Sequence, residues 1–305
     1  MRRRSRHRSV RPTLSRDELG VLLERVYVDC HRRELIDPDP VLVVLRYGSV
    51  ADREMAGLFC ASLALGRARS IADACTRALL PFGENLSAAV RALGSTGTRG
   101  TLGLDRYRFF SGTDMASLLS GIGMIQERCG SLEAAFLATG GSHPGDCYPG
   151  GSHPGGTYSG AGPSASLLGH AEAFVRVLLA ACREAAAALG SKVPLAANLI
   201  SSPRDGSACK RLMLFFRWMV RCDEIDMGCW PGVYPSELVM PLDTHVHRIA
   251  LELGLTRRPV ADLQAALEVT EALRYFDPAD PVRFDFSLAR LGIRSDYSLN
   301  TYIAP

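Results

Sequence analysis

Residues 207–221 read SACKRLMLFFRWMVR, and this stretch indicates the fold more clearly than any other part of the chain. It follows the turn dipeptide Asp205-Gly206, and Ser207 is well placed to cap a helix behind that turn. At 100° per residue, apolar side chains fill one side of this helix. They are Leu212, Met213, Phe215, Phe216, Met219 and Val220. We therefore predict an amphipathic helix over residues 207–222 that packs its apolar side into a core.

Basic side chains occupy the opposite side of the predicted helix. Lys210, Arg217 and Arg221 fall within about 40° of one another on the helical wheel, and Arg211 and Trp218 flank them. We expect this side to face solvent and to present three cations, with Lys210 in the first turn. A solvated basic face without a function is the alternative interpretation.

Lys210 is unusual in its residue type. Lysine and arginine together number 35, and only two of these residues, Lys192 and Lys210, are lysines. A lysine amine can lose its proton, attack an electrophilic carbon and form a Schiff base, which arginine cannot do. A cation in the first turn of a helix opposes the helix dipole by about 0.3–1 kcal/mol, which favours the neutral, nucleophilic amine. A coding bias toward arginine is the alternative explanation; it accounts for the scarcity of lysine but not for its position.

A second distinctive segment, residues 241–250, reads PLDTHVHRIA. Asp243 is well placed to cap a helix that runs through Leu253. It is either a purely structural cap or an anionic group that stabilises a developing positive charge. His245 and His247 cannot chelate one metal ion from a helix, because positions two apart point about 200° from each other. We therefore expect no metal site here, and we expect His245 to face either a pocket or the turn before Lys210.

The remaining pattern is helical almost throughout. Ser15 and Glu18 form a capping box at the start of a first helix, which Pro38 and Pro40 interrupt. A second amphipathic run starts at Asp52 and ends near residue 66. No segment shows period-two alternation bounded by hairpin turns, so we predict an all-α domain. Further helices are predicted at 69–80, 114–128, 166–189, 244–253, 261–275 and 281–290.

Two segments are expected to lie outside the folded body. Residues 1–12 carry six arginines and no acid, so the other residues have a net charge of −3 although the whole chain has +3. This basic tail is either idle or attracts phosphates without sequence preference. Residues 139–165 contain a ten-residue duplication rich in Gly, Ser and Pro, which cannot bury enough apolar surface to fold. We predict a tail over 1–12 and a helical domain over 13–305 that this insert loop interrupts.

Composition argues against several classes of protein. No apolar run reaches the roughly 18 residues that a membrane span needs, and the basic start lacks the apolar core of a secretory signal. The nine cysteines contain no Cys-x-x-Cys pair and no cluster near the C-terminus, which argues against a disulfide framework and an iron–sulfur cluster. His143, Cys147 and His153 of the insert could hold a metal ion, but an idle loop is the favoured interpretation. We expect a cytoplasmic protein with no cofactor, metal or membrane segment.

The segments around Lys210 and Asp243 together resemble the helix–hairpin–helix DNA glycosylase superfamily. The resemblance matches Lys210 to the nucleophile of that superfamily and Asp243 to its essential acid. The stretch from residue 199 to Lys210 has the shape of the hairpin, although only Gly206 of the usual Gly-x-Gly pattern is present. The spacing of 33 residues between Lys210 and Asp243 is longer than in most members and closer to the archaeal 8-oxoguanine glycosylase type.

More narrowly, the body of the chain resembles a bacterial family catalogued as domain of unknown function 2400. The basic tail and the insert lie outside this resemblance. The segments that carry it are 52–67, 130–133, 207–221, 241–254 and 277–286.

These resemblances imply a two-lobed helical fold and a DNA repair glycosylase with lyase activity. A damaged base would be flipped into a pocket between the lobes, where Lys210 attacks C1′ and Asp243 stabilises the positive charge of the sugar. The partner would be double-stranded DNA with a damaged or abasic nucleotide, bound by a monomer at the nucleoid. Arg67 is expected to fill the vacated base stack. The other expected nucleic-acid contacts are Gly206, Ser207, Arg211, Arg217, Arg221 and His245.

Two interpretations from other classes stay open. The chain could be a non-catalytic nucleic-acid-binding protein in which Lys210 contacts phosphate and Asp243 only caps a helix. It could also be a helical protein–protein scaffold. The enzyme interpretation requires the amine at Lys210 and the carboxylate at Asp243 to share a cleft wide enough for an everted nucleotide.

Overall fold

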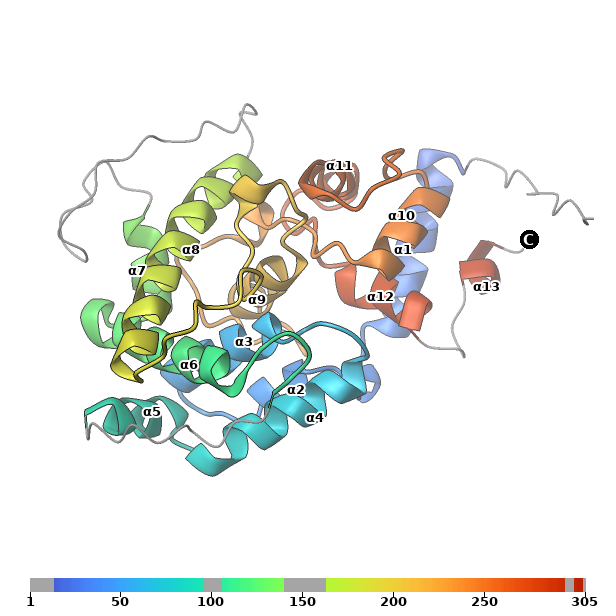
Figure 1. Ribbon diagram of the computed structural model, residues 1–305. Coiled ribbons are helices and arrows are strands. Elements are labelled where there is room, and N and C mark those ends of the chain that lie inside the picture. The colour runs from blue at the N-terminus through green and yellow to red at the C-terminus, as the bar shows by residue number, and fades with distance from the viewer. Residues whose placement is uncertain (1–13, 96–105, 140–162, 294–298, 304–305) are drawn as a thin grey trace, which may run out of the picture.

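The computed structural model describes residues 14–95, 106–139, 163–293 and 299–303, where its secondary structure is helical apart from three isolated bridges (Figure 1). The all-α prediction is confirmed for these residues. The α-helices are α1 Arg16–Cys30, α2 Val41–Val44, α3 Val50–Ser62, α4 Ala68–Leu79, α5 Leu86–Ser95, α6 Gly112–Cys129, α7 Leu132–Ala138, α8 Pro163–Ala188, α9 Lys210–Val220, α10 Thr244–Glu252, α11 Leu263–Arg274, α12 Asp285–Ile293 and α13 Leu299–Ile303. The 3₁₀ turns are η1 Arg33–Leu35, η2 Leu80–Phe82, η3 Pro203–Asp205 and η4 Pro235–Glu237.

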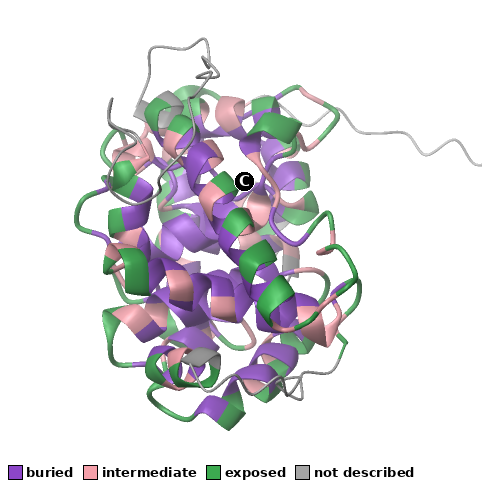
Figure 2. Ribbon diagram, turned by 60° about the vertical axis from the view of Figure 1, so that its left-hand side comes forward, coloured by how far each residue is buried: buried purple, intermediate pink, exposed green. Residues whose placement is uncertain are grey.

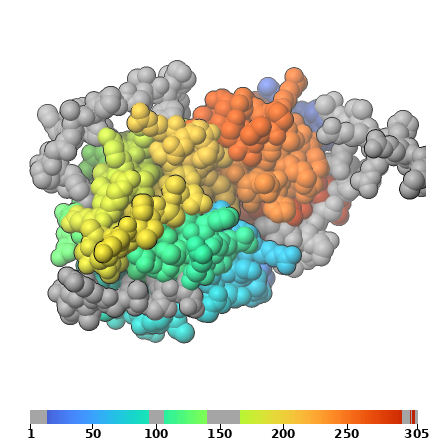
Figure 3. Space-filling view, in the orientation of Figure 1, coloured from blue at the N-terminus to red at the C-terminus, as the bar shows by residue number. Residues whose placement is uncertain are grey.

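Helix α9 lies between two groups of helices (Figure 1). In the first group, α3 packs along α9, and α6 packs against α8. In the second group, α1 and α10 both pack on α12, so the first helix of the chain completes the C-terminal group. The space-filling view shows the orange α10–α11 region beside the yellow and gold segment that leads into α9 (Figure 3). Buried residues line the sides of the helices that face one another, and exposed residues lie on the outer surface (Figure 2).

Local capping signals position several helices. Ser15 and Glu18 form the predicted capping box, in which the Ser15 amide donates to Glu18 Oε2 at 2.7 Å and the Glu18 amide to Ser15 Oγ at 3.3 Å. Helix α3 begins two residues before the predicted start at Asp52, because Ser49 caps it and accepts from the Asp52 amide at 3.1 Å. Helix α8 begins at Pro163, inside the predicted insert. The predicted tail and the rest of the insert lie outside the described residues, apart from Thr139.

A buried carboxylate joins four parts of the first group of helices. Glu54 on α3 is fully buried, and its two oxygens accept four N–H bonds. The donors are Trp230 Nε1 at 2.9 Å, Gln126 Nε2 at 3.0 Å, the Leu132 amide at 2.9 Å and the Glu133 amide at 3.0 Å. The last two amides belong to the first turn of α7, where a negative charge is favourable. Glu54 therefore fixes α3, α6, α7 and the Trp230 loop together.

The prediction that the basic side of α9 faces solvent is wrong for two of its three cations. Arg217 and Arg221 are each only 3% exposed. Arg217 donates to Asp226 Oδ1 at 3.0 Å and 3.2 Å and to Asp285 Oδ2 at 2.5 Å. Arg221 donates to Asp226 Oδ2 at 2.5 Å and to Asp280 Oδ2 at 2.8 Å. A helical wheel gives the direction of a side chain but not what covers it, and carboxylates from two later segments cover this side of α9.

We name the residues Arg217, Arg221, Asp226 and Asp285 the buried charge cluster. It attaches α9 to the loop that follows it and to the start of α12. Buried ion pairs are costly to break, because removal of one partner leaves the other charged and unpaired. The guanidinium groups of Arg217 and Arg221 are therefore structural and are not free to bind a phosphate.

Replacing Arg217 by methionine tests the buried charge cluster. Arg217→Met leaves the carboxylates of Asp226 and Asp285 buried without their main partner, so the free energy of unfolding should fall by about 3–5 kcal/mol. Arg248→Met is the matched control, because the Arg248 side chain is 55% exposed and its ion pair with Glu252 spans one helical turn; it should cost less than about 1 kcal/mol. Chemical denaturation measures both values. Equal losses in the two variants would contradict a structural role for the cluster.

The Glu54 contacts are tested by Glu54→Gln. A glutamine at this position replaces one acceptor oxygen with an NH₂ group that faces N–H donors, so we expect a loss of about 2–4 kcal/mol in the free energy of unfolding. Glu127→Gln changes an exposed glutamate on α6 and should stay within about 0.5 kcal/mol of the parent protein. Thermal unfolding monitored by circular dichroism ranks the two variants. A Glu54→Gln protein as stable as the parent would show that these four bonds do not hold the helices together.

Candidate active site

An open cavity of about 980 Å³ lies where the two groups of helices meet. Its wall combines the connection from α3 to α4 with the first residues of α9, α10 and α12. These segments are far apart in the sequence, so only the tertiary fold creates the cavity. Its volume lies at the upper end of the range typical of small-molecule ligand sites.

Lys210 enters the cavity as the first residue of α9. The helix begins here and not at Ser207, as predicted, because Cys209 adopts a left-handed backbone with φ 45° and ψ 34°. A non-glycine residue in this region costs of order 1 kcal/mol or more, and such strain is typical of functional sites. No side chain caps α9 at Cys209, so the amides of the first turn are not bonded to a capping group. The sharp turn at Cys209 sets the direction of the Lys210 side chain.

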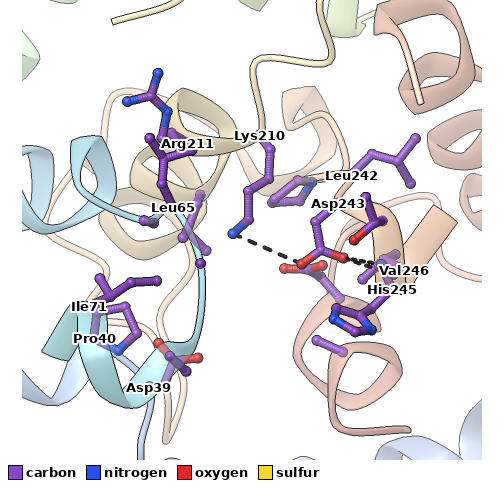
Figure 4. Close-up of a pocket in the computed structure, with 18 of the residues that line it drawn as sticks. Asp39, Pro40, Leu65, Ile71, Lys210, Arg211, Leu242, Asp243, His245 and Val246 are labelled. Carbon is purple, nitrogen blue, oxygen red and sulfur yellow. Dashed lines mark hydrogen bonds and ion pairs between the residues drawn. The ribbon is translucent and has the colours of Figure 1, made fainter. Parts of the chain in front are cut away.

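Asp243 is the N-cap of α10, as predicted. Its Oδ1 accepts from the amides of His245 and Val246, both at 2.9 Å. Its Oδ2 lies 4.0 Å from Lys210 Nζ, and the Lys210 and Asp243 side chains are 30% and 24% exposed. Figure 4 shows the amine and the carboxylate pointing toward each other from opposite sides of the cavity. The fold therefore brings the predicted nucleophile and the predicted acid into one open cleft.

Three other predicted residues lie on the cavity wall. Arg67 is exposed just before α4, His245 is exposed in the first turn of α10, and Ser207 is exposed in the turn before α9. Gly206 adopts a left-handed backbone with φ 72° in the same turn, but it is not part of the wall. Positive φ is easily accessible only to glycine, which explains the residue type at this turn.

Arg211 touches the cavity but does not present its guanidinium to it. Nη1 donates to the carbonyl oxygens of Ser62 at 2.5 Å and Leu199 at 3.1 Å, and Nη2 donates to that of Asn198 at 2.5 Å. The group also lies over the Phe110 ring, 5.6 Å from its centroid. In Figure 4 it points away from Lys210. The predicted phosphate contact by Arg211 is therefore replaced by contacts that tie α9 to the end of α3 and to the segment before η3.

The turn before α9 departs from the predicted hairpin. The residues between α8 and η3 do not form an α-helix, so the first helix of a helix–hairpin–helix element is missing. Instead the turn docks on the start of α11, where the Leu263 amide donates to the Gly206 carbonyl at 3.0 Å and Ser207 pairs with Asp262 as an isolated bridge. The sequence pattern predicted the position of the turn, but it could not predict that the turn docks on the start of α11.

Asp285 is a cavity residue that the sequence did not identify. It opens α12, its side chain is 5% exposed, and its Oδ2 accepts from Arg217 Nη1 at 2.5 Å. Burial raises the pKa of Asp285 to about 6, against the opposite effect of the Arg217 charge and with the help of the Asp243 charge. The only feature of the sequence that could have identified Asp285 as a site residue is its position as an acidic residue within the segment 277–286.

Charge is unevenly distributed over the cavity. The exposed residues of its wall include the cations Arg67, Arg69 and Arg108, whereas the carboxylate of Asp285 lies at a buried position. Asp37 neutralises Arg69 through an ion pair at 2.6 Å. Exposed cations at a cleft attract anions such as phosphates. Carboxylates deeper in the cleft stabilise positive charge that develops inside it.

Within the described residues, no group of three or more His, Cys, Asp and Glu side chains is arranged to hold a metal ion. None of the helices described here combines the length and the apolar character that a membrane span requires. His143, Cys147 and His153, the metal ligands considered for the insert, lie outside the described residues.

Comparison with known proteins identifies a family but not an activity. No curated protein and no solved structure matches the chain. These comparisons provide no link to the helix–hairpin–helix DNA glycosylases, so that part of the resemblance stays a prediction. One family, described as protein of unknown function (DUF2400), matches residues 39–294, which include nearly all of the cavity wall. The chain therefore belongs to the DUF2400 family.

Proposed function

We propose that this chain is a DNA repair glycosylase with lyase activity, which excises a damaged base through Lys210 and Asp243. One observation carries the proposal: the Lys210 amine lies 4.0 Å from the Asp243 carboxylate at the wall of an open cavity of about 980 Å³. A lysine at the mouth of a helix beside a fixed carboxylate suits nucleophilic attack on a carbon that becomes positively charged.

The two residues have distinct tasks in the proposed reaction. The neutral Lys210 amine attacks C1′ of an everted nucleotide, the C1′–N bond to the base breaks, and the base leaves with the bonding electrons. Asp243 Oδ2 faces the reacting carbon and stabilises its positive charge. The two amide bonds to Oδ1 hold the carboxylate in this orientation before the reaction begins. The Schiff base that follows permits loss of a C2′ proton and departure of the 3′ phosphate by β-elimination.

The surroundings of the cavity suit a nucleic-acid backbone. Arg67 and Arg108 are exposed on its wall, and the first turn of α9 lacks a side-chain cap. Unbonded amides at a helix N-terminus favour anionic groups, and arginine side chains bind phosphate without regard to sequence. The partner in this proposal is double-stranded DNA with a damaged or abasic nucleotide, bound by a monomer at the nucleoid. The two groups of helices on either side of α9 would act as the lobes of a helix–hairpin–helix glycosylase-like fold.

Borohydride trapping on abasic and oxidised duplexes tests the proposal. The parent protein should form a covalent adduct with at least one of these duplexes, because borohydride reduces a Schiff base to a stable amine. Lys210→Ala should abolish the adduct, and Asp243→Asn should slow its formation by about 10²–10³-fold through loss of electrostatic stabilisation.

The chain supplies a matched control, because Lys192 is its only other lysine and is exposed. Lys192→Ala should form the adduct at the parent rate. Salt-sensitive binding to duplexes without an adduct on any lesion would instead support a non-catalytic binding protein. Absence of both binding and adduct would leave the scaffold interpretation.

A further inference from the structure

Asp285 presents one carboxylate oxygen to the cavity and anchors the other. Oδ2 accepts from Arg217 Nη1 at 2.5 Å. Oδ1 has no hydrogen-bond partner among the described residues. It is nevertheless not sealed off from solvent, unlike the buried polar atoms without partners. Since Asp285 belongs to the cavity wall, Oδ1 is the oxygen that a bound molecule or a water can reach.

The position of this carboxylate is fixed from behind. Arg217 is 3% exposed, and its remaining donors, Nε and Nη2, bind Asp226 Oδ1 at 3.2 Å and 3.0 Å. Because Asp226 and Asp285 both hold the Arg217 guanidinium, this group cannot move with the Asp285 side chain if that side chain rotates. Asp285 therefore has one orientation, with Oδ2 toward the buried charge cluster and Oδ1 toward the cavity.

Asp243 and Asp285 experience different surroundings. Two backbone amides at a helix N-terminus bind Asp243 and stabilise its negative charge. Burial raises the pKa of Asp285 to about 6. A carboxyl group that titrates near neutrality is suited to accept and release a proton during a reaction.

Several other charged or titratable groups face the same part of the cavity. They are Arg217 and Lys210 from α9, Asp243 and His245 from the start of α10, Arg290 from α12 itself, and Asp39 from the segment before α2. Asp226, in the loop after α9, is not part of the cavity wall, but its charge acts on Asp285 and it binds the same guanidinium. Arg290 is paired with Asp39 at 2.6 Å, so these two charges largely offset each other. Asp285 and Asp243 are thus the carboxylates left for the reacting nucleotide.

We infer that Asp285 is the proton shuttle of the site, which carries a proton from the Lys210 nitrogen to the sugar O4′ while the sugar ring opens. The inference rests on the proposed function. When Lys210 has bonded to C1′, its nitrogen is a cation that must lose a proton. The N–H bond breaks and an O–H bond forms at Asp285 Oδ1, directly or through one water. The nitrogen lone pair then forms the C1′=N bond, the C1′–O4′ bond breaks, and O4′ takes the proton from Oδ1.

Asp285→Asn removes the shuttle and keeps the size of the side chain. On a duplex with a preformed abasic site, the rate of borohydride trapping at pH 7 should fall about 10²-fold. The trapping rate of the parent protein should decline as pH falls through about 6, because a protonated Asp285 cannot accept a proton. Asp285→Asn should lack the step near pH 6, and any decline that both proteins share comes from protonation of the amine, which must be neutral to attack.

Asp226→Asn is the matched control, because Asp226 binds the same guanidinium but is not part of the cavity wall. It should lose stability and yet retain the acidic decline of the parent protein. If Asp226→Asn also lacks the step near pH 6, or if Asp285→Asn keeps the parent rate and profile, the shuttle is refuted.

A second measurement needs no DNA and separates this inference from the proposed function. Formaldehyde with cyanoborohydride methylates lysines through an imine whose formation needs the same transfer of a proton from nitrogen to oxygen. Mass spectrometry reports the ratio of methylation at Lys210 to that at Lys192, which serves as an internal standard within each protein.

Asp285→Asn should lower this ratio at least about tenfold at pH 7, and Asp226→Asn should leave it within about twofold of the parent value. An increased ratio would show that Asp285 acts only as a counter-charge to the amine, which overturns the shuttle. A lowered ratio in a protein that forms no adduct with any duplex would support proton transfer from the Lys210 nitrogen by Asp285 and refute the glycosylase, and with it the transfer to a sugar O4′. The measurement also covers the case in which the variant binds DNA poorly.

Discussion

The structure depends on one buried cation, the guanidinium of Arg217. It binds Asp226 in the loop after α9 and Asp285 at the start of α12, and all three side chains are almost inaccessible to solvent. Lys210 lies two turns earlier on the same helix, so the contact that fixes Arg217 also fixes the position of α9, and with it Lys210, relative to α12. The geometry of the cavity therefore depends on an ion-pair network in the core.

Helix α9 is held on its other side by different chemistry. Arg211 donates to three carbonyl oxygens, at the end of α3 and in the segment before η3. Glu54 in turn fixes α3 to α6 and α7 through four N–H bonds. Helix α9 is thus fixed at its first turn by Arg211 and in its later turns by the buried charge cluster. Such rigidity suits a site in which an amine and a carboxylate must meet within hydrogen-bonding range of a shared substrate.

Features set by local signals could be predicted from the sequence, and features set by tertiary contacts could not. The all-α class follows from helical periodicity, and the cap at Asp243 follows from a short polar residue before an apolar-periodic segment. The burial of Arg217 was missed because its partners, Asp226 and Asp285, are 9 and 68 residues away. The start of α9 was misplaced because nothing in the sequence reveals that Cys209 adopts positive φ.

The distribution of arginine and lysine along α9 indicates that a coding bias does not explain the lysine at position 210. Arg211 uses its fork of donors for three carbonyls, and Arg217 uses its fork for two carboxylates. Both positions need several fixed donors, which guanidinium supplies and ammonium does not. Lys210, between the turn and these two arginines, makes a single polar contact within the described residues, at 4.0 Å from Asp243. The Lys210 amine has no other polar contact in the described part of the chain and lies in a cavity beside the Asp243 carboxylate. In that position the nucleophilic chemistry of lysine, which arginine lacks, explains the residue type.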